Sequence, residues 1–253
     1  MNKTRPLSTL WGTIPVIVVV GIWEITARFH LIPGSIFFPP FSSVVLEIKG
    51  LLFEGALIPN FLSSLGRVTV GFITGSVCGI FIGVCMGWNE RIHSWCRPLI
   101  SLLYPIPALG WLPILMLWIG VNEMLPIAII FICAFFPILY NTVTGIRQVS
   151  PELIDAARML GASDFSILRR VVLPLALPNI FTGLKLESGM AWKVVIAAEM
   201  VAIPTGIGAL MMRAESLVRV DIILVCLIIL SLMCLSFEKF FCFLEEKTTG
   251  EWR

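Results

Sequence analysis

Charged residues are scarce in this chain of 253 residues, because only 13% of its side chains belong to Asp, Glu, Lys or Arg. Apolar side chains make up 58%, which exceeds the roughly half found in soluble domains. A chain of this composition cannot cover its surface with polar groups, so water is excluded as its main solvent and a lipid bilayer is indicated. The net charge of +2 gives no indication of a nucleic-acid partner.

Groups that build metal and catalytic sites are also scarce. There are two histidines, His30 and His93, and they are far apart in sequence. The seven cysteines contain no C-x-x-C pair and mostly fall in apolar runs, which indicates small packing residues. No G-x-x-x-x-G-K-[ST] segment is present, so the chain lacks the loop that cradles nucleotide phosphates. These absences predict no metal, no catalytic residues and no cofactor bound by this chain.

Six apolar segments are candidates for membrane-spanning helices, since a span requires roughly 20 apolar residues. They cover about residues 11–27, 68–88, 99–120, 124–144, 180–203 and 222–244. The first follows Lys3 and Arg5, as a signal peptide would, but no clear small-x-small cleavage site comes after it, which favours a retained helix. We therefore expect an all-α transmembrane protein, with a single domain over residues 1–253.

The distribution of Lys and Arg predicts the orientation of the chain. With the N-terminus in the cytoplasm, eleven basic residues of the connections lie on the cytoplasmic side and four on the outer side. We therefore predict a multi-pass protein of the cytoplasmic (inner) membrane with both termini in the cytoplasm. The long connection 145–179 then lies on the cytoplasmic face. Outside, residues 43–53 are expected to form an amphipathic interfacial helix, and residues 209–212 a short helix.

Five glycines repeat at every fourth position of the second segment. They are Gly71, Gly75, Gly79, Gly83 and Gly87. This spacing places them on one helical face, where another helix can approach closely in lipid. Tight helix packing is the favoured interpretation, and sliding between conformational states is a weaker extension of it.

The third segment contains three prolines within nine residues, in Tyr104-Pro105-Ile106-Pro107 and Trp111-Leu112-Pro113. Each proline removes a backbone donor, and broken backbone at membrane depth is tolerated only against protein or a water-filled path. The segment is therefore expected either to line a pathway or to form a kinked packing helix.

The fifth segment contains four ionisable residues, Lys185, Glu187, Lys193 and Glu199. Such groups usually face the interior of a helix bundle or a water path. In one interpretation they pair with one another or with Arg67. In the other, the central Lys193 guides an anionic solute. The candidate translocation-path residues are Arg67, Pro107, Trp111, Trp192, Lys193 and Glu199.

The cytoplasmic connection reads SPELIDAARMLGASDFSILRRVVLPLALPN from residue 150 and predicts two short helices. Ser150 is expected to cap the first helix, and Gly161 to end it in the left-handed conformation. Ser163 is expected to cap the second helix, which Pro174 and Pro178 end before the fifth span. The result is a compact helix–turn–helix with small alanines on one exposed side, where a partner surface can approach the backbone.

This connection resembles the EAA loop of ABC importer permeases in Asp155-Ala156-Ala157, Gly161 and Val171-x-Leu173-Pro174, with the family spacing throughout. Asp155 replaces the usual Glu, and Val171 replaces Ile. In that family the loop forms coupling helices that seat in a groove of the ATPase subunit. The resemblance implies an ATPase-docking site at Glu152, Asp155, Ala156, Ala157, Leu160, Gly161, Ala162, Phe165, Leu173 and Pro174. An ordinary helical hairpin between spans is the alternative.

Motifs elsewhere are similar to the taurine, alkanesulfonate, nitrate and bicarbonate branch of that family. They are FPP at 38–40, SLxR at 64–67, PxPxxxWxP at 105–113, LWxG at 117–120, AW at 191–192, AE at 198–199, GxG at 206–208 and Trp252. The resemblance implies a six-helix type I ABC importer permease (MetI-like) fold with cytoplasmic coupling helices. It also implies two ABC ATPase subunits that hold ATP and Mg, an extracytoplasmic solute-binding protein, a second permease copy in a homodimer, and import of a small, mostly anionic solute.

Two other classes of membrane protein share this composition. A secondary transporter or channel without an ATPase partner does not need the docking loop and more often shows internal repeats, of which no convincing one is evident. An intramembrane enzyme needs a histidine cluster, a Ser–Lys pair or paired aspartates at depth, and none is visible. The branch spans sulfonates, nitrate, bicarbonate and heterocyclic vitamin precursors, and selectivity among them is expected to reside in the binding protein.

Overall fold

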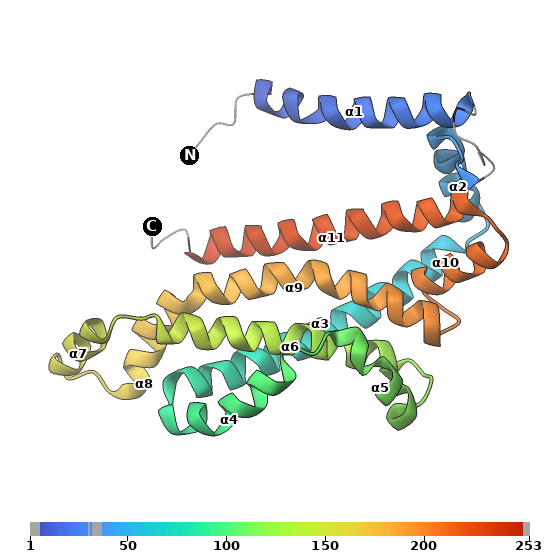
Figure 1. The fold of residues 1–253 in the computed structure, drawn as a ribbon. Coiled ribbons are helices and arrows are strands. Elements are labelled where there is room, and N and C mark those ends of the chain that lie inside the picture. The colour runs from blue at the N-terminus through green and yellow to red at the C-terminus, as the bar shows by residue number, and fades with distance from the viewer. Residues whose placement is uncertain (1–5, 30, 32–36, 250–253) are drawn as a thin grey trace. The chain divides into compact units, whose positions relative to one another are not determined.

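The computed structural model describes residues 6–29, 31 and 37–249, which form helices joined by turns and short connections, with no strand among them (Figure 1). The predicted all-α fold is therefore confirmed. The chain divides into two compact units, Met1–Pro59 with Leu210–Ile229, and Asn60–Ala209 with Leu230–Arg253. Several residues used in the sequence predictions, namely Lys3, Arg5, His30 and Trp252, lie outside the described residues, as do both chain ends.

The first unit is built from α1 (Pro6–Arg28), α2 (Phe41–Phe53), most of α10 (Ile207–Ser216) and the start of α11 (Val220–Thr249). Trp23 of α1 joins α1 to the segment before α2, because its indole nitrogen donates to the carbonyl of Pro39 at 3.0 Å. Its ring also contacts Phe41 edge-on at 5.4 Å. The helices predicted over 43–53 and at 209–212 are both present, as α2 and α10, and each is longer than predicted.

The second unit carries the candidate sites. It contains nearly all of α3 (Leu57–Trp88), α4 (Glu90–Leu103), the 3-10 turn η2 (Ala108–Trp111), α5 (Leu112–Ile119), α6 (Met124–Arg147), α7 (Pro151–Met159), α8 (Asp164–Ile167), the π-helical turn η3 (Leu168–Val172), α9 (Leu173–Ala202) and the end of α11. Helices α6 and α9 lie side by side along their lengths (Figure 1).

Glycines let α3 and α9 approach α6 at backbone distance. All five glycines of the predicted α3 face lie against α6. A methyl group added at Gly75 would lie 2.7 Å from the carbonyl oxygen of Phe131. On the opposite contact, a methyl group added at Gly145 of α6 would lie 2.7 Å from the Cβ of Asn179. In lipid such contacts gain dispersion energy that larger side chains would prevent.

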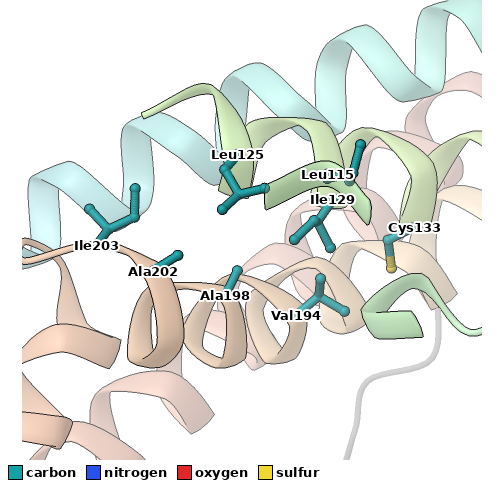
Figure 2. Close-up of a cluster of buried hydrophobic side chains, with 8 residues drawn as sticks. All are labelled: Leu115, Leu125, Ile129, Cys133, Val194, Ala198, Ala202 and Ile203. Carbon is teal, nitrogen blue, oxygen red and sulfur yellow. The ribbon is translucent and has the colours of Figure 1, made fainter. Parts of the chain in front are cut away.

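An apolar cluster fills the space between α5, α6 and α9, as Figure 2 shows. It consists of Leu115, Leu125, Ile129, Cys133, Val194, Ala198, Ala202 and Ile203, each less than a tenth exposed. Trp111 and its neighbours in η2 pack against this cluster from the side. The cluster thereby holds the turn that follows α4 against the α6–α9 pair. Cys133 in this cluster is a free thiol, as are the other six cysteines.

Within the described residues, four helices are long and apolar enough to cross a bilayer, namely Leu57–Trp88, Met124–Arg147, Asp164–Ala202 and Val220–Thr248. A fifth crossing is added if α4 and the η2–α5 pair count as one broken span, since they are bent by 84°. The predicted span 99–120 is therefore wrong as a single helix. Pro105 and Pro107 cause the break, because proline lacks the N–H and disfavours helical geometry in the residue before it.

The helix boundaries around the long connection also differ from the prediction. Helix α8, the η3 turn and α9 form one continuous helical run, Asp164–Ala202, so Pro174 and Pro178 do not end a helix. The π-helical turn immediately precedes Pro174 and shifts the hydrogen-bond ladder where the proline ring enters. Pro178 lies inside α9, where packing against neighbouring helices compensates for one missing backbone bond.

The glycine contacts generate a stability prediction. Gly75→Ala is expected to lower the free energy of unfolding by about 1–3 kcal/mol, because its methyl group meets the backbone of α6. Gly66→Ala on the same helix is the matched control, since nothing lies within 4 Å of its added methyl group. Thermal unfolding in detergent, followed by size-exclusion chromatography, measures both. Equal effects of the two substitutions would contradict the backbone contact.

Candidate functional site

The 150–174 loop is shaped by local sequence signals. Gly161 ends α7 with a φ of +81°, and the Ser163 hydroxyl caps α8 by accepting the Ser166 N–H at 3.3 Å, as predicted. The prediction for Ser150 is wrong. Its hydroxyl is turned toward the Glu152 carboxylate, to which it donates, and it accepts no backbone N–H of α7. That bond holds the pKa of Glu152 below its ordinary value.

A buried cluster anchors the loop to the ends of α6 and α9. Its members are Ile146, Val149, Ile167, Val172, Ala176 and Ile180. From α7, Ile154 and Ala157 pack against this cluster on their half-buried face. Arg158 then ties α7 to α8, because its guanidinium lies 3.5 Å from Asp155 and 3.4 Å from Asp164. These exposed ion pairs add little energy, so the cluster anchors the loop and the pairs orient it.

The loop exposes four large apolar side chains. Leu153 is 50% exposed, Met159 86%, Leu160 89% and Phe165 71%. We call these four side chains the loop patch. Ala156 is exposed beside them and leaves room for close approach. Large apolar side chains exposed in this way are typical of contact sites for another protein.

The predicted docking residues divide between two positions. Six are exposed and accessible to a partner, namely Glu152, Asp155, Ala156, Leu160, Gly161 and Phe165. Four are half-buried and support the loop from beneath, namely Ala157, Ala162, Leu173 and Pro174. Sequence reasoning missed Leu153 and Met159. Met159 is not part of the EAA pattern, but it lies three residues after Ala156 and therefore on the same face of α7. An apolar residue at that spacing was the signal in the sequence that could have identified it.

A buried ion cluster lies at the opposite end of α9. The Arg67 guanidinium donates to Glu199 at 2.6 Å, and to Glu123 at 2.6 and 2.8 Å. It also donates to the carbonyl and hydroxyl of Thr205 at 2.8 and 2.6 Å. Glu123 lies in the turn before α6, and the hydrogen bond from Arg67 holds its pKa below the ordinary value. One arginine thus joins α3, the α5–α6 turn and the segment after α9.

Glu199 is the acceptor at the centre of this ion cluster. Its carboxylate accepts from the Ser64 hydroxyl at 2.8 and 2.9 Å and from the Gly208 N–H at 3.0 Å. The carboxylate fills the space where a side chain at Gly206 would lie, since an added Cβ would be 2.3 Å from it. The glycines of the 206–208 segment are thereby explained, because they leave room for the side chain and backbone of the α9 end.

The six candidate path residues do not converge on one site. Arg67 and Glu199 belong to the ion cluster, and Trp111 packs against the apolar cluster of Figure 2. Trp192 is fully buried and contacts Phe237 of α11 edge-on at 5.4 Å. Lys193 is exposed, and its ammonium lies 3.9 Å from the Met190 sulfur. The sixth candidate, at position 107, lines a pocket beside the broken segment.

That pocket also contains Glu187, which the sequence indicated as an ionisable residue of the span but not as a site residue. Cys133, read as a packing residue, donates its thiol to the Glu187 carboxylate at 3.5 Å. Nothing in the sequence pairs these two positions, 54 residues apart. Among the residues that the structure describes, no group of three or more His, Cys, Asp or Glu side chains could hold a metal ion.

Comparisons with known proteins agree with this architecture. The family model of the binding-protein-dependent transport system inner membrane component matches residues 75–249. A protein of Methanocaldococcus jannaschii assigned as an ABC transporter permease is 41% identical over 240 residues, covering 93% of this chain and 89% of that relative. The taurine transport system permease protein of Escherichia coli is 30% identical, with 93% and 86% covered.

A solved structure supports the fold. The MetNI methionine ABC transporter in an inward-facing conformation matches with a TM-score of 0.57, over 71% of this chain and 92% of the matched chain. Its sequence identity of 18% supports the fold alone. The MetI-like permease fold that the resemblance implied is thereby confirmed.

The ion cluster generates a second stability prediction. Glu199→Gln is expected to cost about 3 kcal/mol, because it leaves the buried Arg67 charge with one carboxylate in place of two. Glu123→Gln is the matched control and is expected to cost less than about 1 kcal/mol, since the Glu123 side chain is 65% exposed. Thermal unfolding in detergent compares the two. A larger effect of the Glu123 substitution would contradict the central role of Glu199.

Proposed function

Because this chain belongs to the family of binding-protein-dependent transport system inner membrane components, we propose that its 150–174 loop is the seat of a separate ATPase. Members of the family are the non-catalytic permease subunits of ABC importers. The chain is therefore the membrane-spanning part of such an importer, and ATP is hydrolysed on another subunit. The loop patch is the observation that carries the docking proposal, because it is apolar, exposed and firmly anchored.

The anchoring of the loop supports a mechanism for coupling. When two ATPase subunits close around ATP and Mg, the groove that holds the loop patch moves. Ile167 and Val172 are fully buried against the ends of α6 and α9, so the loop moves these helices with it. One change between two global states then links ATP hydrolysis to the opening of the solute path. The ATPase biases that change through the loop, and the solute-binding protein biases it from the other face.

The remaining assembly follows the family. A second copy of the permease completes the path as a homodimer, and an extracytoplasmic binding protein delivers the solute. The exposure of helix α4 supports a contact with another subunit, since none of its residues is buried in this chain and Trp95 is 86% exposed. In the proposed orientation both termini and the 150–174 loop face the cytoplasm, and the ion cluster lies at the outer end of α9.

The cargo is a small solute, in line with the relative named for taurine transport. Lys193 supports an anionic group on that solute, because its exposed ammonium lies within a membrane-spanning helix. Pro107 supports a path beside the broken segment, where it lines the pocket.

Docking at the loop patch is tested by co-purification. Ala156→Glu is expected to abolish retention of the ATPase by the tagged permease, because a charged side chain replaces a small one in the contact. Thr248→Glu adds the same charge at an exposed position near the end of α11 and is expected to retain the ATPase. Both variants should insert into the membrane in normal amounts. Full retention by the Ala156 variant would contradict the docking proposal.

Orientation is tested by labelling from each face of the membrane. In a chain whose native cysteines are replaced by alanine, Val121→Cys introduces an exposed thiol before the start of α6, and Met159→Cys introduces one in α7, after the end of α6. A membrane-impermeant maleimide is expected to label Met159→Cys only in inside-out vesicles and Val121→Cys only in right-side-out vesicles. The reverse pattern would place the loop outside the cell and overturn the proposed orientation.

A further inference from the structure

A pocket of about 300 Å³ lies beside the break between α4 and η2. Tyr104, Ile106 and Pro107 of the break line one side, while residues of α6 and α9, including Phe136 and Met190, line the others. This volume is at the lower end of the range for small-molecule sites, which corresponds to a solute of one small ring or less. Broken backbone at membrane depth, as found here, is typical of transporter binding sites.

Among the described residues that line this pocket, Glu187 has the one charged side chain. It lies 12 residues before Glu199 on α9, or about 18 Å along the helix, which places it near the middle of the span. Among the described residues, the Cys133 thiol donates a hydrogen bond to its carboxylate at 3.5 Å, and a thiol is a weak donor. No salt bridge to Glu187 occurs within the described part of the chain.

Two other acidic side chains of this unit, Glu199 and Glu245, each have a positively charged partner within the chain. Glu199 receives a guanidinium, a hydroxyl and a backbone N–H. Glu245 of α11 accepts from the Lys185 ammonium at 2.7 Å. A carboxylate in an apolar wall is costly unless a positive group or a strong donor meets it. Glu187 therefore has the chemistry of a group whose partner arrives from outside the chain.

We propose that this pocket receives the transported solute, and that Glu187 accepts hydrogen bonds from an ammonium or amino group on it. The apolar and aromatic walls contact the body of the solute, as in other small-molecule sites. The inference rests on the proposed function, since it assigns the solute of the same permease. It adds an amino group to the solute class and is compatible with an acidic group elsewhere on the same molecule. An inorganic anion would be repelled, and a lipid acyl chain would leave the carboxylate without a partner.

Cys133 provides a reporter inside the pocket, because its sulfur lies beside the Glu187 carboxylate. The test uses the complete transporter in proteoliposomes, with the other six cysteines replaced by alanine. Modification of Cys133 is followed by mass spectrometry with two methanethiosulfonate reagents, one bearing a trimethylammonium group and one a sulfonate. We expect the cationic reagent to react at least ten times faster. Benzylamine is expected to slow this reaction, and benzoate, which has the same ring, to leave it unchanged.

Variants of the carboxylate assign the preference to Glu187. Glu187→Gln is expected to reduce the ratio of the two rates to near one, whereas Glu187→Asp keeps the charge and the preference. Glu238→Gln on the exposed surface of α11 is the matched control and should leave the ratio unchanged. A ratio near one in the parent chain, an unchanged ratio in Glu187→Gln, or failure of both reagents to reach Cys133 would each overturn the proposal.

The outcome is separable from the proposed function. Retention of the ATPase is measured on the same variants, all of which keep the loop patch intact. A chain that retains the ATPase but shows no cation preference at Cys133 would refute the solute assignment alone. A chain that shows the preference but never retains an ATPase would refute the docking proposal alone.

Discussion

Backbone-to-backbone contact between α3, α6 and α9 is the constraint on which the rest of this unit depends. Lipid tails are as apolar as the side chains, so the hydrophobic effect does not drive these helices together and close packing must. The glycines of α3 supply that packing on one side of α6, and Gly145 and Gly183 supply it on the other. The register set by these contacts brings Cys133 of α6 opposite Glu187 of α9, and brings Arg67 of α3 within reach of Glu199.

Two kinds of polar chemistry are built on this frame, and they differ in how fully their charges are satisfied. At one end of α9, Arg67 and Glu199 have partners for nearly every donor and acceptor, so that region is rigid and structural. Near the centre of α9, the Glu187 carboxylate accepts a hydrogen bond from the thiol of Cys133, which is a weak donor. The first arrangement stabilises a segment of the chain, and the second leaves a site ready for a ligand. The hydrogen-bond and ion-pair partners of a charged side chain within a membrane span therefore indicate its role better than its position along the helix does.

Sequence reasoning succeeded where the signal was local. The glycine period, the Ser163 cap and the left-handed Gly161 depend on residues within one or two helical turns, and the structure shows each of them. It failed where the outcome depends on distant partners or on backbone adjustment. The π-helical turn lets the helix pass Pro174, which no spacing rule indicated. Similarly, the pairing of Glu187 with Cys133 exists only after α6 and α9 have packed, so the acid could be noticed in the sequence but not placed.

The uninterrupted run Asp164–Ala202 has a geometric consequence. Its 39 residues extend over about 58 Å, and the loop anchor Ile167, the pocket acid Glu187 and the ion-cluster acid Glu199 all lie along it. The π-helical turn and two prolines lie between the loop and the pocket, but the helix continues through them, so the number of residues sets the angular phase of the three side chains. A single-residue insertion between the loop and the pocket would turn everything beyond it by about 100°. The proposed solute pocket and the proposed docking loop thus lie on one helical run, which constrains the number of residues between them more than the identity of their side chains.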